Sequence, residues 1–467
     1  MPAQNKTGEI SWKPKIRKAE GPVYLAIADA LSADVQSGQL APGARLPPQR
    51  ALAEALGIDF TTVSRGYAEA RKRGLVEGRV GQGTYVRGRR SEGARTETGG
   101  LVDMSMNLPP RFEDPALEDR MWDGIEGLRR RDGLDLLLRY QEPGGAARDR
   151  AAGANWLQAR SPGVTPDRLL VSPGAQGALL AIVSLLAPTG STICAEFLAY
   201  PGLRSLAAHL KLQLIGVPLD VDGPIPEAFD EICAVHRPRA FYCNPTQHNP
   251  TTRTIPLARR EALIRVARQR QVPIIEDDAY GFLPLKSPPA FAALAPDLVY
   301  YIAGLAKCLA PALRIAYVAA PDARVAARVA AAIRATAATA SPLTAAIASC
   351  WIEEGVAGRI LSAIRRETAA RTAIAADILR GQTMLNDPES FHLWLTLPAP
   401  WTRAEFAARL RVSGVGVVTS DAFALGAPPE AVRIGLGASE NREALRKSLE
   451  VLVDLLAQSP AEASTIV

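Results

Sequence analysis

The stretch YYIAGLAKCLAPALRIAY (residues 300–317) says most about the fold of this 467-residue chain. It begins with an apolar run that predicts a buried strand, and Lys307 and Arg314 follow it. A lysine in an apolar setting loses its proton more readily than an exposed one, and its neutral amine can then attack an aldehyde. A lone lysine is usually an exposed surface residue, so the meaning of Lys307 depends on the motifs around it.

Similar apolar runs recur on both sides of this stretch and alternate with long helical stretches rich in Ala, Leu and Arg. They read LLVS, FYCN, PIIE and LVYYIAG. This rhythm predicts a mostly parallel sheet covered by helices, an α/β fold. After about residue 330, the runs FHLWLTL, GVGVVTS and VRIGLGA, separated by helices, predict a smaller α+β lobe. We therefore assign the body to residues 104–467, with a larger lobe over about 135–330 and a smaller lobe over about 331–467 plus 104–134.

A second pattern, PPQRALAEALGIDFTTVSRGYAEA (residues 47–70), predicts two short helices. The first ends at Gly57, and Asp59 is a suitable N-cap for the second, so the pair forms a helix-turn-helix. A longer helix is expected before it, starting at Pro22. LVEGRVGQGTYV, which follows the pair, predicts a β-hairpin with a glycine-rich tip.

Charge and composition separate the two ends of the chain. Residues 1–90 hold 15 Lys and Arg against 8 Asp and Glu, whereas the remainder holds 39 against 40. A basic module on a near-neutral body suggests a polyanionic partner for that module, although a solvated basic tail would give the same charge. GRRSEGARTETGG (residues 88–100) has no apolar side chain larger than alanine. We therefore expect a basic tail over 1–20, a folded head over 21–87 and a linker over 88–103.

Several classes of protein are not indicated by the composition. No apolar run approaches the roughly 20 residues that a membrane-spanning helix needs, and the first residues lack the pattern of a secretory signal, so a cytoplasmic protein is expected. The five cysteines form no C-x-x-C pair and the four histidines show no metal-ligand spacing. We expect no zinc site and mostly buried, reduced thiols.

Residues 21–87 resemble the winged-helix domain of the GntR family of transcription regulators, on the strength of LPPQR and GQGTYV in this order and at this distance. The resemblance implies a double-stranded DNA operator as partner, with the second helix of the pair in the major groove and the hairpin tip near the minor groove. Phe60 and Ser64 depart from the family, because many members carry arginine at these positions. The DNA-contacting residues that we expect are Arg45, Arg50, Thr61, Thr62, Arg65, Gln82 and Gly83.

From about residue 101 onward the chain resembles the type I fold of aminotransferases, which binds pyridoxal 5′-phosphate. Four ordered motifs carry the resemblance: LLVSPGAQGALLAIVSLL, AEFLAYPG, NPTQHNPT followed by PIIEDDAYGFL, and the opening stretch with Lys307. In the first motif a glycine turn starts a helix, so the free amide groups of Ala175 and Gln176 point outward, where a phosphate would sit.

The resemblance implies a role for each cofactor-binding residue. Tyr200 stacks on the ring, Asn249 and Tyr280 face its hydroxyl, Asp277 faces its nitrogen, Lys307 forms the Schiff base and Arg314 clamps the phosphate. A carboxylate beside the ring nitrogen keeps that nitrogen protonated, which makes the ring an electron sink.

The chain also departs from the aminotransferase pattern at the cofactor site. Hydroxyl residues commonly precede the lysine by three and by one, but Gly304 and Ala306 stand there, and Thr252 replaces the usual glycine after NPT. Loss of a hydroxyl bond to a charged phosphate would weaken cofactor retention.

Two further residues are expected to face the substrate or effector. Arg433, in VRIGLGA, matches the arginine that holds a carboxylate, and Tyr140, in LLRYQEPGG, resembles the residue that a partner subunit lends to the site, which implies a homodimer. The alternatives are an edge-strand ion pair for Arg433 and a packed aromatic for Tyr140.

A GntR-type head joined by a linker to an aminotransferase-like body resembles the MocR subfamily of bacterial regulators over essentially the full chain. The resemblance implies a DNA-binding regulator that senses pyridoxal phosphate, an amino compound, or both, through an internal aldimine on Lys307. Two alternatives remain open: an active aminotransferase that also carries a DNA-binding domain, and a repressor whose body binds no cofactor and only dimerises.

Overall fold

The computed structural model describes residues 12–14, 22–36, 39–40, 44–73, 75–79, 83–86 and 102–458. The chain forms two units, residues 1–98 and 99–467, which we call the head and the body and describe separately. Within the part of the chain that the structure describes, no helix has the length and apolar content needed to span a bilayer.

The head has the predicted helices and hairpin. They are α1 (Val23–Gln36), α2 (Gln49–Leu56), α3 (Phe60–Lys72), β1 (Val76–Arg79) and β2 (Gly83–Val86), with the two strands antiparallel. Gly57 ends α2 in the left-handed conformation at φ 62°, which glycine adopts without steric cost. Asp59 caps α3, because its carboxylate accepts a hydrogen bond of 2.7 Å from the backbone N–H of Thr61.

Trp12 contributes to the core of the head, so the predicted basic tail over residues 1–20 is wrong at this residue. Trp12 is only 7% exposed and packs with Ile27, Leu31 and Tyr67 in one apolar cluster. Its indole N–H donates a hydrogen bond of 2.7 Å to the carboxylate of Asp34. The charge of the segment concealed one large apolar side chain that the small core buries.

The body is built on a seven-stranded sheet of order β4-β12-β11-β10-β9-β5-β6, in which only β12 is antiparallel to its neighbours. The mostly parallel α/β sheet is therefore confirmed. Its strands are β4 (Leu169–Ser172), β5 (Thr192–Glu196), β6 (Gln213–Val217), β9 (Phe241–Cys243), β10 (Ile274–Asp277), β11 (Val299–Gly304) and β12 (Ala316–Ala319). Outside the edge strand β6, nearly all of their side chains are buried, as expected for a sheet covered on both faces.

Alternate residues of each strand enter two separate cores, one on each face of the sheet. Ile275 and Tyr242 belong to one core, and Ile274 and Phe241 belong to the other. The first face is covered by α7 (Gly174–Leu186), α8 (Pro201–His209) and α12 (Ala323–Ala337). The second face is covered by α6 (Ala147–Leu157), α9 (Pro226–His236), α10 (Leu257–Arg270), α11 (Phe291–Leu294) and α13 (Pro342–Glu353). All five cysteines are buried free thiols, as predicted.

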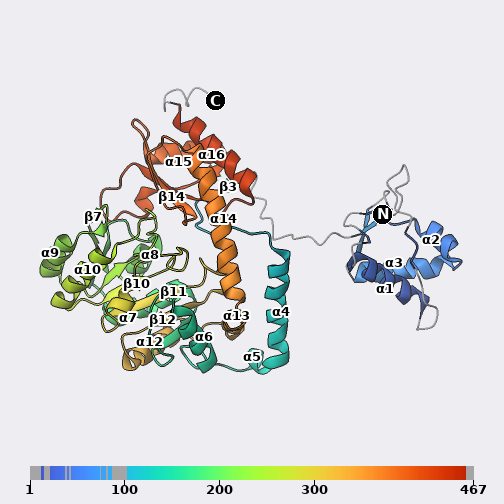
Figure 1. Ribbon diagram of the computed structural model, residues 1–467, viewed down its shortest axis with the longest axis horizontal. Helices are drawn as coiled ribbons and strands as arrows, with labels where there is room; N and C mark the ends of the chain where they lie inside the picture. The colour runs from blue at the N-terminus through green and yellow to red at the C-terminus, as the bar shows by residue number, and fades with distance from the viewer. Residues whose placement is uncertain are drawn as a thin grey trace. The chain divides into compact units, whose positions relative to one another are not determined.

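The predicted smaller α+β lobe is present and contains an antiparallel sheet of order β13-β14-β17-β16. Its strands are β13 (Met384–Asn386), β14 (His392–Thr396), β16 (Val418–Thr419) and β17 (Ala431–Gly435), and its helices are α15 (Arg403–Val412) and α16 (Arg442–Leu456). The long helix α14 (Val356–Ile378) joins the lobes, since Ile364 packs in the core of the larger lobe and Ala375 in that of the smaller one (Figure 1).

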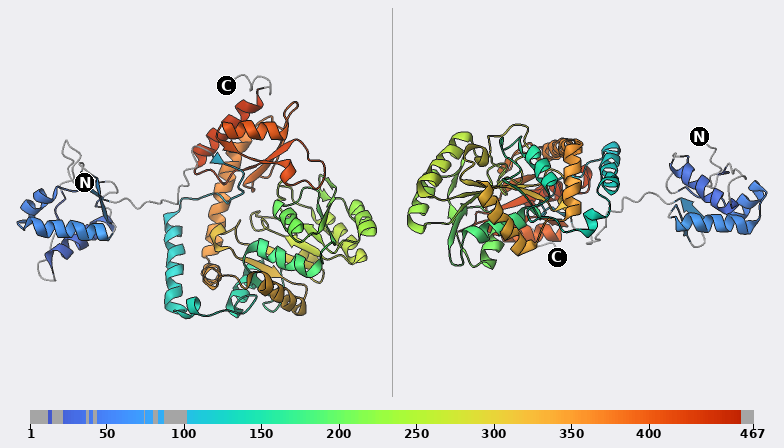
Figure 2. Two further views of the ribbon diagram at one scale, coloured as in Figure 1. Left: turned by 180° about the vertical axis from the view of Figure 1, so that it is seen from behind. Right: turned by 90° about the horizontal axis from the view of Figure 1, so that it is seen from below.

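The lobe boundaries differ from those predicted. Residues 331–353 belong to the larger lobe, because the end of α12 packs on its sheet and Trp351 of α13 lies in its core. Helix α4 (Pro115–Arg131) also packs there, against α13 and α14, and the two views of Figure 2 show it beside α14. The sequence pattern marked these helices but not which lobe buries them.

The predicted linker overlaps the body at its end. Residues 102 and 103 form β3 (Val102–Asp103), which pairs in parallel with β15 (Val415–Gly416) in the smaller lobe. The smaller elements of the body are α5 (Asp135–Leu138), β7 (Leu219–Asp220), β8 (Gly223–Pro224) and the 3-10 turns η1 (Pro311–Leu313) and η2 (Ser420–Ala422).

Candidate functional site

A cavity of about 560 Å³ opens at the ends of the central strands of the larger sheet, and residues of the smaller lobe complete its wall. Side chains that are far apart in the sequence meet here because several strands end at one edge of the sheet. Of the ten body residues that we predicted for the site, Tyr140 does not line the cavity and the other nine do: Ala175, Gln176, Tyr200, Asn249, Asp277, Tyr280, Lys307, Arg314 and Arg433.

Lys307 follows the end of β11 and directs its amine into the cavity. The Nζ atom donates a hydrogen bond to the backbone carbonyl of Asn107. Burial and, to a smaller extent, Arg433 lower the pKa of Lys307 to about 8, while Asp277 acts in the opposite direction. A larger fraction of this amine than of an ordinary lysine is therefore neutral and nucleophilic near neutral pH.

Asp277 is the last residue of β10. Its Oδ2 accepts a hydrogen bond of 2.8 Å from the Tyr242 hydroxyl, whereas its buried Oδ1 has no hydrogen-bond partner among the described residues. Burial raises the pKa of this carboxyl to about 6, and the Tyr242 bond opposes the rise. A buried carboxylate oxygen without a donor is costly, so Oδ1 fits a protonated ring nitrogen that would supply one.

The opposite end of the cavity suits an anion. Ala175 and Gln176 lie in the first turn of α7, where backbone N–H groups have no partner within the helix. Arg314 lines the same end, and a Cβ built on Gly174 would lie 3.6 Å from its guanidinium carbon. Helix amides and a guanidinium together match the phosphate of the expected cofactor.

The departure from the family pattern at Gly304 has a steric counterpart here. A Cβ at this position would lie 3.3 Å from the Cβ of Ala175, which is closer than ordinary van der Waals contact. A hydroxyl-bearing side chain at Gly304 would thus crowd the start of α7, so the phosphate end relies on backbone amides and Arg314.

Three predicted ring-facing residues line the middle of the cavity. Tyr280 accepts a hydrogen bond of 2.8 Å from the side-chain amide of Asn107. Asn249 is held by its backbone N–H, which donates to Asn244 at 2.8 Å. Burial raises the pKa of both Tyr200 and Tyr280, so these phenols remain protonated at neutral pH and can donate.

Arg433 lies on β17, between β14 and β16, and not on an edge strand. It donates from Nη1 to Asn249 Oδ1 at 3.0 Å and from Nη2 to the carbonyl of Ser105, while its guanidinium lies 5.4 Å from the Phe423 ring centroid. No acidic side chain forms a salt bridge with it among the described residues, and burial lowers its pKa. A buried guanidinium without a carboxylate is suited to bind one from a ligand.

Tyr140 lies outside the cavity of its own chain. It is fully exposed, as are large parts of Leu134, Leu137 and Leu138 in and around α5. These four side chains, which we call the α5 patch, span seven consecutive positions. The alternative of a packed aromatic is not supported within a single chain.

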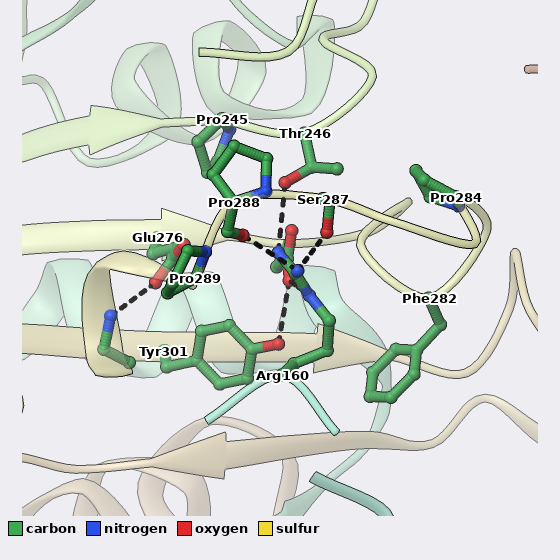
Figure 3. Close-up of polar contacts among 12 residues, drawn as sticks. Arg160, Pro245, Thr246, Glu276, Phe282, Pro284, Ser287, Pro288, Pro289 and Tyr301 are labelled. Atoms are coloured by element: carbon green, nitrogen blue, oxygen red, sulfur yellow. Dashed lines mark hydrogen bonds and ion pairs between the residues drawn. The ribbon is translucent and has the colours of Figure 1, made fainter. Parts of the chain in front are cut away.

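Asp278, next to Asp277, takes part in a buried ionic network. Figure 3 shows its neighbours Arg160, Thr246 and Tyr301. The Oδ2 atom of Asp278 accepts hydrogen bonds from Arg160 Nε at 3.0 Å and from the Tyr301 hydroxyl at 2.9 Å. Arg160 also donates to Thr246 at 3.2 Å. The network ties the end of β10 to the loop that carries Asn249 and thereby supports the cofactor-facing residues.

Sequence reasoning did not identify several residues that line the cavity. Asn244 could have been found as the first asparagine of the NPTQHNPT motif, and Tyr242 by its place two residues before it. Ser105, Asn107 and Phe423 gave no signal, because they reach the cavity only through the packing of the smaller lobe.

In the head, the predicted DNA-contacting residues cluster around the start of α3 and the hairpin. The Arg50 guanidinium lies 5.9 Å from the Phe60 ring centroid, and that of Arg65 lies 4.3 Å from the Tyr24 ring centroid. The Thr61 hydroxyl donates to Asp59, so Thr61 also contributes to the cap.

At the hairpin, the backbone of Arg45 bridges to Tyr85 of β2, and a Cβ on Gly83 would lie 3.1 Å from Arg45 Nε. Thr62 lies in the first turn of α3. Gln82 falls outside the described residues.

Comparison with known proteins identifies both parts of the chain. Residues 130–452 match the family described as aminotransferase class I and II, and residues 23–86 match the bacterial regulatory proteins of the gntR family. The chain is 31% identical over 456 residues to the uncharacterized HTH-type transcriptional regulator YdeF of Bacillus subtilis, covering 96% of this chain and 97% of that protein.

Two other comparisons concern a second regulator and a solved structure similar to the body. The probable rhizopine catabolism regulatory protein MocR of Rhizobium meliloti is 26% identical over 65% of this chain and 66% of its own length. The fold of the body is that of LysN, the alpha-aminoadipate aminotransferase of Thermus thermophilus, with a TM-score of 0.69 at 23% identity over 79% of this chain and 94% of LysN.

The body thus has the type I aminotransferase fold, whose cofactor is pyridoxal 5′-phosphate, and the cavity residues fit that group at its ring nitrogen and at its phosphate. A gntR-family domain precedes this body in the same chain. The protein belongs to the MocR subfamily of GntR-type transcription regulators.

Proposed function

We propose that this regulator senses pyridoxal 5′-phosphate, an amino compound, or both, at Lys307, and that the state of this site sets its affinity for an operator. The observation that carries the proposal is the convergence of nine predicted residues on one cavity that holds an amine of lowered pKa. The same chain carries a reader of double-stranded DNA. We also place the protein in the cytoplasm, where its operator would be.

Different residues of the cavity would hold different parts of the cofactor and of the ligand. Ala175, Gln176 and Arg314 would hold the phosphate, and Asp277 would keep the ring nitrogen protonated. Pyridoxal 5′-phosphate, when bound, would supply an aldehyde that reacts reversibly with primary amines. Arg433 would hold the carboxylate of an amino compound whose amine approaches Lys307.

A regulator needs differential binding and not turnover. A ligand can change DNA affinity only by as much as it prefers one arrangement of the protein over another, typically about 5–150-fold. The cavity is compatible with a regulator that binds a ligand, even if the protein turns over no substrate.

An active aminotransferase is the second candidate, because Asp277, Lys307 and Arg433 together are what such an enzyme requires. Repeated amino transfer from an amino acid to a keto acid by the purified full chain would support it. A third candidate, a body that only dimerises, would be supported if the protein supplied with pyridoxal phosphate developed no visible absorbance.

We further propose that the protein is a homodimer in which the α5 patch contacts a second copy. The patch contains four large apolar side chains, each more than 60% exposed in the single chain. Such a cluster is unusual on a free surface and typical of an interface. In this arrangement Tyr140 of each chain would be available to the partner's cavity.

The experiment compares wild type with Lys307→Ala, with Lys286→Ala as the control at an exposed lysine in the same lobe. The probe is a duplex selected from a random library by the wild-type protein, and affinity is measured with and without pyridoxal 5′-phosphate and candidate amines. We expect a ligand response of about 5-fold or more in wild type and in Lys286→Ala, and none in Lys307→Ala. An equal response in all three proteins contradicts the proposal.

A further inference from the structure

Asn107 forms hydrogen bonds with two predicted site residues, Lys307 and Tyr280, although nothing in the sequence indicated it. It is 6% exposed. Its backbone carbonyl accepts the hydrogen bond from Lys307 Nζ, and its side-chain amide donates to the Tyr280 hydroxyl oxygen at 2.8 Å. Its own Oδ1 is buried without a partner among the described residues. One residue therefore contacts both the amine and a phenol of the cavity.

The residues just before Asn107 are held by the same wall of the cavity. The Ser105 carbonyl accepts a hydrogen bond from Arg433 Nη2, and the Met104 carbonyl accepts one of 2.8 Å from the backbone N–H of Gly435. Residues 102 and 103 form β3. We call residues 102–107 the link segment, because they comprise the last two residues of the predicted linker and the four residues that follow it.

We propose that Asn107 is a positioning residue for Lys307 and Tyr280, and that the link segment carries the state of the cavity toward the linker. This inference rests on the proposed function and specifies which residues respond when a ligand occupies the cavity. The link segment is the part of the chain that would respond to the ligand, and it is continuous with the linker.

The positioning role follows from the direction of the hydrogen bonds. Because the Asn107 amide donates to the Tyr280 oxygen, the proton of that hydroxyl is directed elsewhere, toward an acceptor in the cavity. The Asn107 carbonyl orients the Lys307 amine in the same way. The side chain and the backbone of one residue thus set the geometry of two groups that face the cofactor.

The transmitting role follows from competition. Lys307 and Arg433 are the groups that a cofactor aldehyde and a ligand carboxylate would engage, and both now donate to carbonyls of the link segment. A ligand that engages either group competes with these carbonyls. Hydrogen bonds to charged groups are stronger than neutral ones, so their loss loosens the segment measurably.

Hydrogen exchange of the full-length protein tests the transmitting role. The probe is pyridoxal 5′-phosphate, with inorganic phosphate as the control ligand, and the readout is exchange in peptides that cover residues 102–108. In wild type we expect pyridoxal 5′-phosphate to speed this exchange about tenfold, the factor that corresponds to one lost bond to a charged group. Phosphate alone should have no effect. In Lys307→Ala the exchange should already be fast and should not respond.

A spectroscopic comparison tests the positioning role. The pH midpoint of the visible absorbance is measured for protein loaded with pyridoxal 5′-phosphate, in wild type, Asn107→Ala and Asn107→Ser, which keeps a donor. Asn441→Ala is the matched control, because it removes a helix cap in the same lobe at a residue that does not line the cavity. We expect Asn107→Ala to move the midpoint, Asn107→Ser to restore part of the shift and Asn441→Ala to have no effect.

The outcomes separate this inference from the proposed function. If wild type shows the visible band but exchange of the link segment does not respond and Asn107→Ala leaves the midpoint unchanged, the inference is overturned and the proposed function stands. If wild type shows no band at all, the proposed function fails, and this inference fails with it.

Discussion

At the scale of single residues, the environment of Lys307 makes a prediction about pH. Its pKa is lowered to about 8, mainly by burial. Only the neutral amine attacks an aldehyde, so the rate of reaction with pyridoxal 5′-phosphate should rise about tenfold per pH unit below 8 and level off above it. Stopped-flow absorbance of the full chain from pH 6 to 9.5 measures this. A rate that is independent of pH below 8 contradicts the assignment, and Lys307→Ala should show no reaction.

The position of Phe60 leads to a prediction about the DNA sequence that the head binds. It is the first residue of α3, it is 43% exposed, and no other large apolar side chain is exposed among the described residues of the head. Arg50 lies against its ring. An aromatic side chain at the start of a recognition helix can contact a thymine methyl group, where an arginine would read guanine.

We therefore expect replacement of the critical thymine by uracil in a selected duplex to weaken wild-type binding about fourfold, as the burial of one methyl group would predict. The same replacement should not affect Phe60→Ala. Equal sensitivity of both proteins to uracil at every position of the duplex would show that Phe60 reads no thymine.

At the scale of elements, Trp12 extends the core of the head beyond its helices and hairpin. Trp12→Ala should destabilise the head by about 3–5 kcal/mol, the usual cost of removing a buried aromatic side chain. Trp12→Phe keeps most of the packing but loses the bond to Asp34, and should cost about 1 kcal/mol beyond the change in ring size. Hydrogen exchange of the α1 amides in the full chain measures both. Unchanged exchange in Trp12→Ala would mean that Trp12 does not support α1.

The elements also show what could be predicted from the sequence. Caps such as Gly57 and Asp59 act within a few residues, so the end of α2 and the start of α3 were predicted at their observed positions. The resemblance of the motif around Lys307 and Arg314 to aminotransferases likewise predicted residues that line one cavity. Asn107 could not be predicted, because it contacts Lys307 across 200 positions of sequence and only the packing of the smaller lobe brings them together.

The errors in the predicted boundary between the two lobes have the same cause. Helix α13 and the end of α12 were assigned to the smaller lobe by their order in the chain. The structure packs them with the larger core, because their apolar faces match its side chains. Helical periodicity shows that a face is buried, but it does not show which core buries it.

At the scale of the whole molecule, the α5 patch predicts the oligomeric state. Leu138→Glu places a charge in the proposed interface and should convert a dimer to a monomer in analytical ultracentrifugation. Val412→Glu is the matched control, because Val412 is 90% exposed on the smaller lobe and outside the patch. If both variants sediment like wild type, the patch is not the interface.

The central claim is that a ligand at Lys307 and an operator at the head affect one another through the protein. Thermodynamic linkage requires such an effect to be reciprocal. The most direct measurement is the affinity of the full-length protein for pyridoxal 5′-phosphate, followed by its absorbance, with and without a saturating selected duplex. We predict that the duplex changes this affinity by the same factor by which the cofactor changes duplex affinity. Equal cofactor affinity on and off DNA would contradict the account.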